Sequence, residues 1–242
     1  MTLELTLAPL QADLVALLRA TREAERDLFA ALPEAVRDQS GVIGAWSPKD
    51  VLAHLAAWRA VEARRIEAAR TGNPNPPEDP PLGEPVDESN ARIHEDFAGA
   101  GWEAVELRAD ESIEALVHEI GESSTDILCD CRDDIVGIGA NGANHAIMHL
   151  SEIARLGSAG ERYRAFGREL EGILARGHLP PRDSGVLHYN LACHYALWDH
   201  LDDARRLLKQ AFGQRHDLRS TAQDDPDLEA LREELDALAG ES

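Results

Sequence analysis

Basic residues are scarce in this chain, where 24 lysines and arginines stand against 45 acidic residues and give a formal net charge of -21. The acidic residues are spread along the sequence instead of being collected in one tail. Because no basic stripe is available to neutralise phosphates, the composition argues against nucleic acid and anionic membranes as partners. No apolar run reaches the roughly 18 residues of a membrane helix, so we expect a cytoplasmic protein without a signal peptide.

Cysteine and aromatic residues are also few, with three Cys, four Phe, three Tyr and four Trp among 242 residues. An odd set of cysteines in a chain of this kind argues against a disulfide framework. The core must be made mostly of Leu, Ala, Ile and Val, a composition that favours helix over sheet. We therefore expect an all-α fold, and the length allows one large domain or two small ones.

Apolar residues recur at the three- and four-residue spacing of amphipathic helices. The clearest helix start is Ser47-Pro48-Lys49-Asp50. Ser is a good N-cap, Pro suits the first turn, and the Asp carboxylate can accept hydrogen bonds from exposed backbone N–H groups. Six prolines in 72–85 predict a long loop, and the acidic segment 129–137 predicts a connection. Helices are expected at about 9–32, 47–71, 87–98, 102–120, 138–156, 162–175, 186–197, 201–212 and 227–238.

The long and the short helices divide the chain into two predicted domains. Four principal helices with one long crossover within 1–158 indicate an up-down four-helix bundle. In 161–242, six residues alternate between small and large and resemble one tetratricopeptide repeat (TPR), in which small residues let two antiparallel helices approach closely. One repeat is too short to stand alone, so we expect these TPR-like hairpins to pack on the bundle or on a second subunit. The six residues are Leu191, Ala192, Tyr195, Ala204, Leu208 and Ala211.

Three histidines form the main candidate site. His145 and His149 are one helical turn apart on a strongly apolar helix, so both ring nitrogens can reach one ion. His54 lies on the core-facing side of an earlier helix, where a histidine needs a partner. Three neutral imidazoles suit Zn, Ni or another borderline divalent ion and leave a position open for water or substrate. The alternative is that these are ordinary core or interface histidines, because a bare HxxxH motif is weak.

Two segments carry a family resemblance. Residues 46–55, Trp-Ser-Pro-Lys-Asp-Val-Leu-Ala-His-Leu, resemble the second-helix motif of the DinB-like superfamily of four-helix bundles, and residues 141–149 resemble the start of its last helix. The resemblance covers about residues 7–157 and implies a metal triad of His54, His145 and His149. Members of that superfamily include S-transferases and isomerases that use mycothiol or bacillithiol, amide hydrolases, and proteins that inactivate a reactive cyclopropane genotoxin. The Trp-Ser-x-Lys-Asp start is most similar to the last group.

The resemblance implies a metal-dependent enzyme that transfers a low-molecular-weight thiol to a small reactive electrophile, or hydrolyses it. A divalent ion would lower the pKa of a thiol or water at its open position. No Ser-His-Asp or Cys-His arrangement is readable, so the sequence does not support covalent catalysis by the protein. The relatives also imply a homodimer. The other hypothesis is a non-catalytic scaffold that binds a protein partner through residues 161–242.

Three polar residues one turn from the histidines are candidates for orienting the imidazoles. Helix capping already explains Asp50, and Glu152 is interpreted as a solvated charge. For Asn141, an orienting role and a purely structural role both stay open.

Several further residues are interpreted as structural or incidental. Trp46 and Trp58 could line a pocket, but we expect both in the core. Cys129 and Cys131 have no second cysteine pair to complete a metal site. The tail histidines that we do not expect to bind a metal are His188, His194 and His200.

Overall fold

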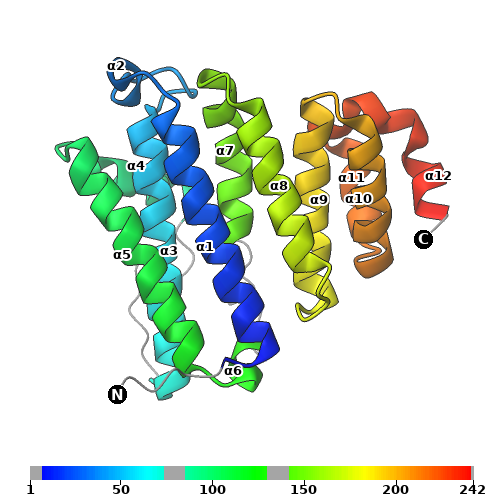
Figure 1. The fold of residues 1–242 in the computed structure, drawn as a ribbon, viewed down its shortest axis with the longest axis horizontal. Helices are drawn as coiled ribbons and strands as arrows, with labels where there is room; N and C mark the ends of the chain where they lie inside the picture. Colours follow the sequence, from blue (N-terminus) through cyan, green and yellow to red (C-terminus); the bar gives the residue numbers. More distant parts are fainter. Residues whose placement is uncertain (1–6, 74–84, 130–141, 241–242) are drawn as a thin grey trace. The chain divides into compact units, whose positions relative to one another are not determined.

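The computed structural model describes residues 7–73, 85–129 and 142–240, and these ranges are helical with no named strand (Figure 1). The all-α class predicted from composition is therefore confirmed for the described part of the chain. The chain divides into two compact units, Met1–Phe166 and Gly167–Ser242. This division falls within α8 (Gly160–Leu174), whereas the sequence suggests one between 158 and 161.

Four helices of the first unit pack around a shared apolar core. One of them, α1, contacts α5 and α7, and α3 contacts the same two helices. The interior holds fully buried leucine, isoleucine and phenylalanine side chains, among them Leu28, Phe29 and Leu55. The four helices are α1 (Pro9–Ala30), α3 (Pro48–Thr71), α5 (Trp102–Glu122) and α7 (His145–Leu156).

The directions of these helices differ from a strict up-down order. Near the carboxyl ends of α3 and α5, Arg70 Nε donates to Glu119 Oε2 at 2.9 Å, so these two helices run parallel (Figure 1). Gln11 near the start of α1 bonds to Ile120 near the carboxyl end of α5, and Arg22 further along α1 bonds to Asp110 further toward the start of α5. These two helices are therefore antiparallel. The predicted alternation is therefore wrong for α3 and α5, because α4 (Val86–Phe97) occupies the crossover between them and packs on α3.

Most predicted helices of the first unit are confirmed within about two residues at each end. The short helices α2 (Glu34–Arg37) and α6 (Thr125–Cys129) were not expected. Of the predicted helix at 138–156, the described part begins with a π-helical turn at 142–144 that leads into α7. Most of the predicted loop at 72–85 and of the predicted connection at 129–137 lies outside the described residues.

In the second unit, α9 (Pro181–Leu197) and α10 (Leu201–Gln214) form a tightly packed hairpin. The helix α9 begins at Pro181, earlier than the predicted residue 186, because proline is well suited to the first turn of a helix. All six residues that suggest a repeat are buried. Tyr195 lies over Gly167 of α8, where an added Cβ would come within 2.2 Å of the tyrosine Oη.

The predicted helix at 227–238 is wrong in its first part. Residues Pro226–Glu234 form a 3-10 helix, η2, and only Leu235–Gly240 is α-helical, as α12. The Asp225 carboxylate caps η2 by accepting from the backbone N–H of Asp227 at 2.9 Å. Arg232 donates to the carbonyl oxygens of Asp225 at 2.8 Å and of Ala222 at 3.2 Å, and these bonds tie η2 to the preceding α11 (Leu218–Asp224).

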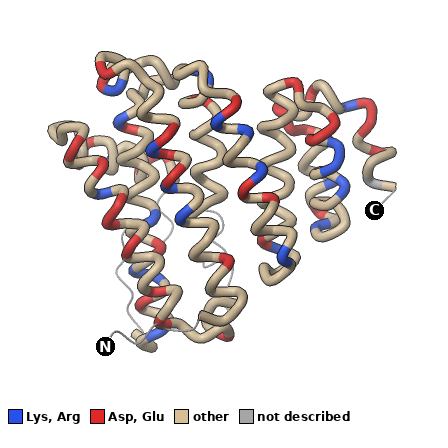
Figure 2. Tube along the Cα trace, in the orientation of Figure 1, with Lys and Arg blue, Asp and Glu red and all other residues tan. Residues whose placement is uncertain are grey.

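Acidic residues lie along the helices of both units, with basic residues among them (Figure 2). This distribution agrees with the even spread of charge along the sequence. Within the described residues, no helix combines the length and the apolar character that crossing a membrane requires.

Candidate metal centre

A reciprocal cap fixes the start of α3 and thereby the position of His54 along the bundle. The backbone N–H of Asp50 donates to Ser47 Oγ at 3.2 Å, and the backbone N–H of Ser47 donates to Asp50 Oδ2 at 2.8 Å. These bonds satisfy two backbone donors that a helix start otherwise leaves free. The prediction that Asp50 is a capping residue is confirmed. His54 follows one turn later and is only 4% exposed.

Close packing against α1 fixes the start of α7 and therefore His145. The π-helical turn at 142–144 contains Gly142, where an added Cβ would lie 2.7 Å from Leu18 Cδ2 of α1. Only glycine permits this approach without a shift of the leucine. One further face of α7 is fully buried, as shown by Ile147 and Leu150, whereas Met148 is 53% exposed. Packing of the buried face helps to hold the histidine face toward α3.

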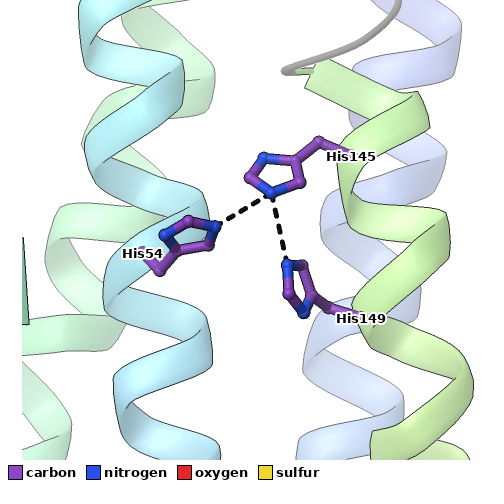
Figure 3. A group of neighbouring side chains, drawn as sticks. All are labelled: His54, His145 and His149. Atoms are coloured by element: carbon purple, nitrogen blue, oxygen red, sulfur yellow. Dashed lines mark hydrogen bonds between the residues drawn. The ribbon is translucent and has the colours of Figure 1, made fainter. Parts of the chain in front are cut away.

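The structure brings the three predicted histidines together (Figure 3). His145 Nε2 lies 2.9 Å from His54 Nε2 and 3.2 Å from His149 Nε2. One ligand atom from each residue lies within 4.8 Å of the others, and this group could hold a metal ion. His54 is buried, whereas His145 and His149 are half-buried. The nitrogens therefore converge at a place that solvent reaches in part.

The spacing of the nitrogens fits a shared ion. Zn–N bonds of about 2.0–2.1 Å in tetrahedral geometry place two ligand nitrogens about 3.3 Å apart. The separations of 2.9 and 3.2 Å are close to this value. Each Nε2 carries either one hydrogen or one lone pair, so His145 Nε2 cannot make two good hydrogen bonds to its neighbours. A cation shared by three lone pairs satisfies all three atoms at once.

Burial keeps the histidines in the neutral form that binds metals. Desolvation, followed by the charge of His149, lowers the pKa of His54 from 6.5 to about 3. Desolvation is also the largest cause that lowers the pKa of His145 to about 2, and the charges of His54, His149 and Arg59 add to it. The pKa of His149 is lowered by desolvation. At neutral pH the three rings thus present lone pairs instead of competing with a cation.

Two tryptophans flank His54. The Trp46 ring centroid lies 4.9 Å from that of His54 and 6.5 Å from that of His149, and Trp58 lies 6.4 Å from His54. Both tryptophans are half-buried, so the prediction that they belong to the core is wrong. The Trp46 backbone pairs with Ile43 through N–H···O bonds of 2.9 and 3.1 Å, directly before the α3 cap. This turn holds the indole at the edge of the site, and sequence spacing alone does not show it.

Two of the three polar residues considered as imidazole partners, Asp50 and Glu152, have the other role that the sequence favours. Asp50 serves the α3 cap, and Glu152 is exposed, as predicted. Asn141 lies outside the described residues. Within the described ranges, Nδ1 of His54 and Nδ1 of His145 are buried without a hydrogen-bond partner. No hydrogen bond at Nδ1 to a described residue therefore orients these two rings.

A buried ion pair near the histidines was missed by the sequence interpretation. Arg59 of α3 and Glu25 of α1 are both 0% exposed and form a bidentate pair, one bond of which is 3.1 Å from Nη1 to Oε2. Arg22 reaches the same Glu25 oxygen at 3.2 Å and donates to Asp110 at 2.6 Å. The positive charge of Arg59 is one of the lesser causes of the lowered His145 pKa. Charged residues on core-facing positions of two helices are the signal that could have indicated this pair.

The described residues contain one group that could hold a metal ion. Among the residues that the structure describes, the three-histidine group is the only convergence of three metal-binding side chains. Cys129 is exposed, and Cys131 lies outside the described ranges. His188 Nδ1 contacts Gln214 Oε1 at 3.0 Å, which gives this ring a structural partner.

Comparisons with protein-family models, curated proteins and solved structures found no match to this chain. Its function therefore has to be inferred from the histidines and their surroundings.

Proposed function

We propose that His54, His145 and His149 bind one divalent ion, Zn or Ni, in a metal-dependent enzyme. The observation that carries this proposal is the convergence of three neutral Nε2 atoms at separations of 2.9 and 3.2 Å. Three protein ligands, without a fourth among the described residues, are typical of catalytic rather than structural zinc sites. The proposed reaction transfers a low-molecular-weight thiol, such as bacillithiol or mycothiol, to a small reactive electrophile, or hydrolyses that electrophile.

The helix arrangement supports a DinB-like four-helix bundle for residues 1–158. Four helices surround one core, a crossover connects α3 to α5, and the histidines come from the second and last of the four. This order matches the two segments that resemble the superfamily, 46–55 and 141–149. The proposal of a thiol-dependent detoxification reaction rests on that resemblance, whereas the proposal of a metal rests on geometry.

The chain supplies a binding and shielding environment. When bound, a divalent ion would provide Lewis acidity and lower the pKa of a thiol or water at its open position. The three histidines would bind as neutral rings, because burial lowers the pKa of each. The Trp46 indole, 4.9 Å from His54, would exclude water from one side of the site. No described side chain is needed as a covalent nucleophile.

Metal analysis of the refolded full-length chain tests the proposal. Protein is unfolded with a chelator, refolded with Zn or Ni, desalted and analysed by mass spectrometry for metal content. We expect one ion per chain in the wild type and loss of binding in His149→Ala. The matched control is His118→Ala on α5, whose side chain is 65% exposed and outside the site. Wild-type protein that stays metal-free with both ions would contradict the proposal.

The reaction needs a separate test. The metal-loaded protein is screened with bacillithiol and mycothiol against a panel of small electrophiles, and consumption of thiol and electrophile is followed. Turnover that His149→Ala abolishes supports the enzyme. A metal-binding protein without turnover of any pair would leave the metal proposal standing and contradict the proposed reaction.

A second candidate function is protein binding through the TPR-like residues 161–242. The observation that favours it is a cavity of about 540 Å³ in the second unit, whose lining includes Glu171, His188, Arg206 and Lys209. Such a mixture of acid and base suits polar peptide groups. A partner recovered with the wild type and the triple-histidine variant, but not after deletion of the tail, would favour this function over the enzyme.

A further inference from the structure

A second cavity lies in the first unit, between α3, α4 and α5, and has a volume of about 650 Å³. This volume falls within the range of about 300–1,000 Å³ that is typical of small-molecule sites. None of the three histidines lines the cavity, so it is distinct from the candidate metal centre. A ligand bound there would be separate from the metal.

The floor of the cavity is apolar and made of small residues. Three alanines of α3, Ala56, Ala57 and Ala60, line it together with Ile93 and Phe97 of α4. The lining on α5 extends from residue 104 to residue 115, about 16 Å along a helix that rises about 1.5 Å per residue. Small side chains in a row leave room for an elongated apolar group. The floor thus favours an alkyl chain over a compact polar ligand.

The charged lining distinguishes this cavity from the rest of the chain. Arg64, Arg92 and Arg108 line it against only Asp96 and Glu111, in a protein whose formal net charge is -21. Arg108 donates to Glu111 at 3.0 Å, and both side chains are exposed. Each of the three helices contributes one guanidinium group. Guanidinium groups bind carboxylates through paired, charge-assisted hydrogen bonds.

We propose that this cavity binds a small amphipathic carboxylate, with its alkyl chain along the alanines and its head group toward the arginines. Charge complementarity favours the anion, because a cationic amphiphile of the same length would meet three guanidinium groups against two carboxylates. The apolar floor selects the chain, because a short carboxylate such as acetate would leave it uncovered. The site is independent of the proposed metal and of the proposed reaction.

Titration calorimetry of the full-length chain with decanoate, below its micelle concentration, tests this proposal. We expect saturable one-to-one binding, with decanol, acetate and decyltrimethylammonium binding at least tenfold more weakly. Decanoate binding should be retained in His149→Ala, which separates this site from the metal centre. The absence of saturable binding, or equal binding of decyltrimethylammonium, would overturn the proposal.

Two variants locate the ligand. Ala60→Leu places a larger side chain in the cavity and should weaken decanoate binding at least tenfold. Arg92→Gln removes one guanidinium group and should weaken it at least threefold. The control is Arg26→Gln on α1, whose guanidinium pairs with Asp110 outside the cavity. Circular dichroism checks that each variant folds. If Ala60→Leu does not fold, Arg92→Gln alone tests whether decanoate binds in the cavity. Equal affinity of Arg92→Gln and Arg26→Gln would place the ligand elsewhere.

Discussion

The buried pair of Arg59 and Glu25 allows a sharp test of the packing described for the first unit. Both side chains are 0% exposed, and removal of Arg59 leaves Glu25 paired with Arg22 at 3.2 Å. Loss of one partner of a buried pair typically costs about 3–5 kcal/mol, because a charge remains without compensation. Because Arg22 still compensates part of the Glu25 charge, we expect Arg59→Leu to lower the free energy of unfolding by about 3 kcal/mol, the lower end of this range.

The matched control is a solvent-exposed ion pair between α1 and α5. Arg19 and Glu114 are 49% and 61% exposed, so Arg19→Leu should cost less than about 1 kcal/mol. The double variant Arg59→Leu/Glu25→Leu removes both buried charges and should recover most of the loss, because apolar replacement of a whole buried pair is often neutral. Arg22 still has Asp110 at 2.6 Å in that variant.

Urea unfolding followed by tryptophan fluorescence measures these differences. Trp46, Trp58 and Trp102 belong to the first unit, so a Trp198→Phe background makes the signal report on that unit alone. Two results would refute the reasoning that the pair is shielded from water and that its two charges depend on each other. One is a loss of under about 1 kcal/mol in the free energy of unfolding for Arg59→Leu, and the other is a double variant as unstable as the single one.

Three further predictions concern the site and its supports. Burial lowers the pKa of His54 and His145 below 6.5, so these groups stabilise the metal-free fold above pH 6.5 and this stability is lost as pH falls toward 3. The urea midpoint of metal-free protein should therefore decrease as the pH is lowered from 7 to 5. An equally steep decrease in His54→Gln/His145→Gln would contradict this. Gly142→Ala should destabilise the fold by about 1–3 kcal/mol in the same urea assay, because its Cβ would lie 2.7 Å from Leu18 Cδ2; unchanged stability would argue against the close approach. Ni²⁺ at the histidines should quench Trp46 and Trp58, whose rings lie 4.9 and 6.4 Å from that of His54, so the double variant Trp46→Phe/Trp58→Phe should lose most of the quenching, whereas Trp198→Phe should retain it; equal quenching in both variants would contradict the site.

The sequence predicts local features of this protein well. The cap at Ser47 and Asp50 depends on residues three apart, and the period of apolar residues locates the long helices without reference to other segments. The separation of His145 and His149 by one turn also follows from helix geometry. These features were predictable because each is decided within a few residues of chain.

Contacts between distant segments could not be predicted with the same certainty. Trp46 contacts His149 although the two are far apart in sequence, and its position depends on a turn with Ile43. The pairing of Arg59 with Glu25 depends on the register of α3 against α1, which neither segment encodes alone. In the tail, the Arg232 bonds to backbone carbonyls accompany a 3-10 helix where apolar spacing predicts an α-helix. Tertiary contacts decide all three.

Anomalous diffraction from crystals grown with Zn²⁺ tests the central claim most directly. The proposed metal centre predicts one strong peak at the zinc edge, at about 2.0–2.1 Å from the Nε2 atoms of His54, His145 and His149. Crystals of His149→Ala grown in the same way should lack this peak. A wild-type map without a peak between α3 and α7, at a zinc concentration that gives peaks elsewhere on the molecule, would contradict the claim.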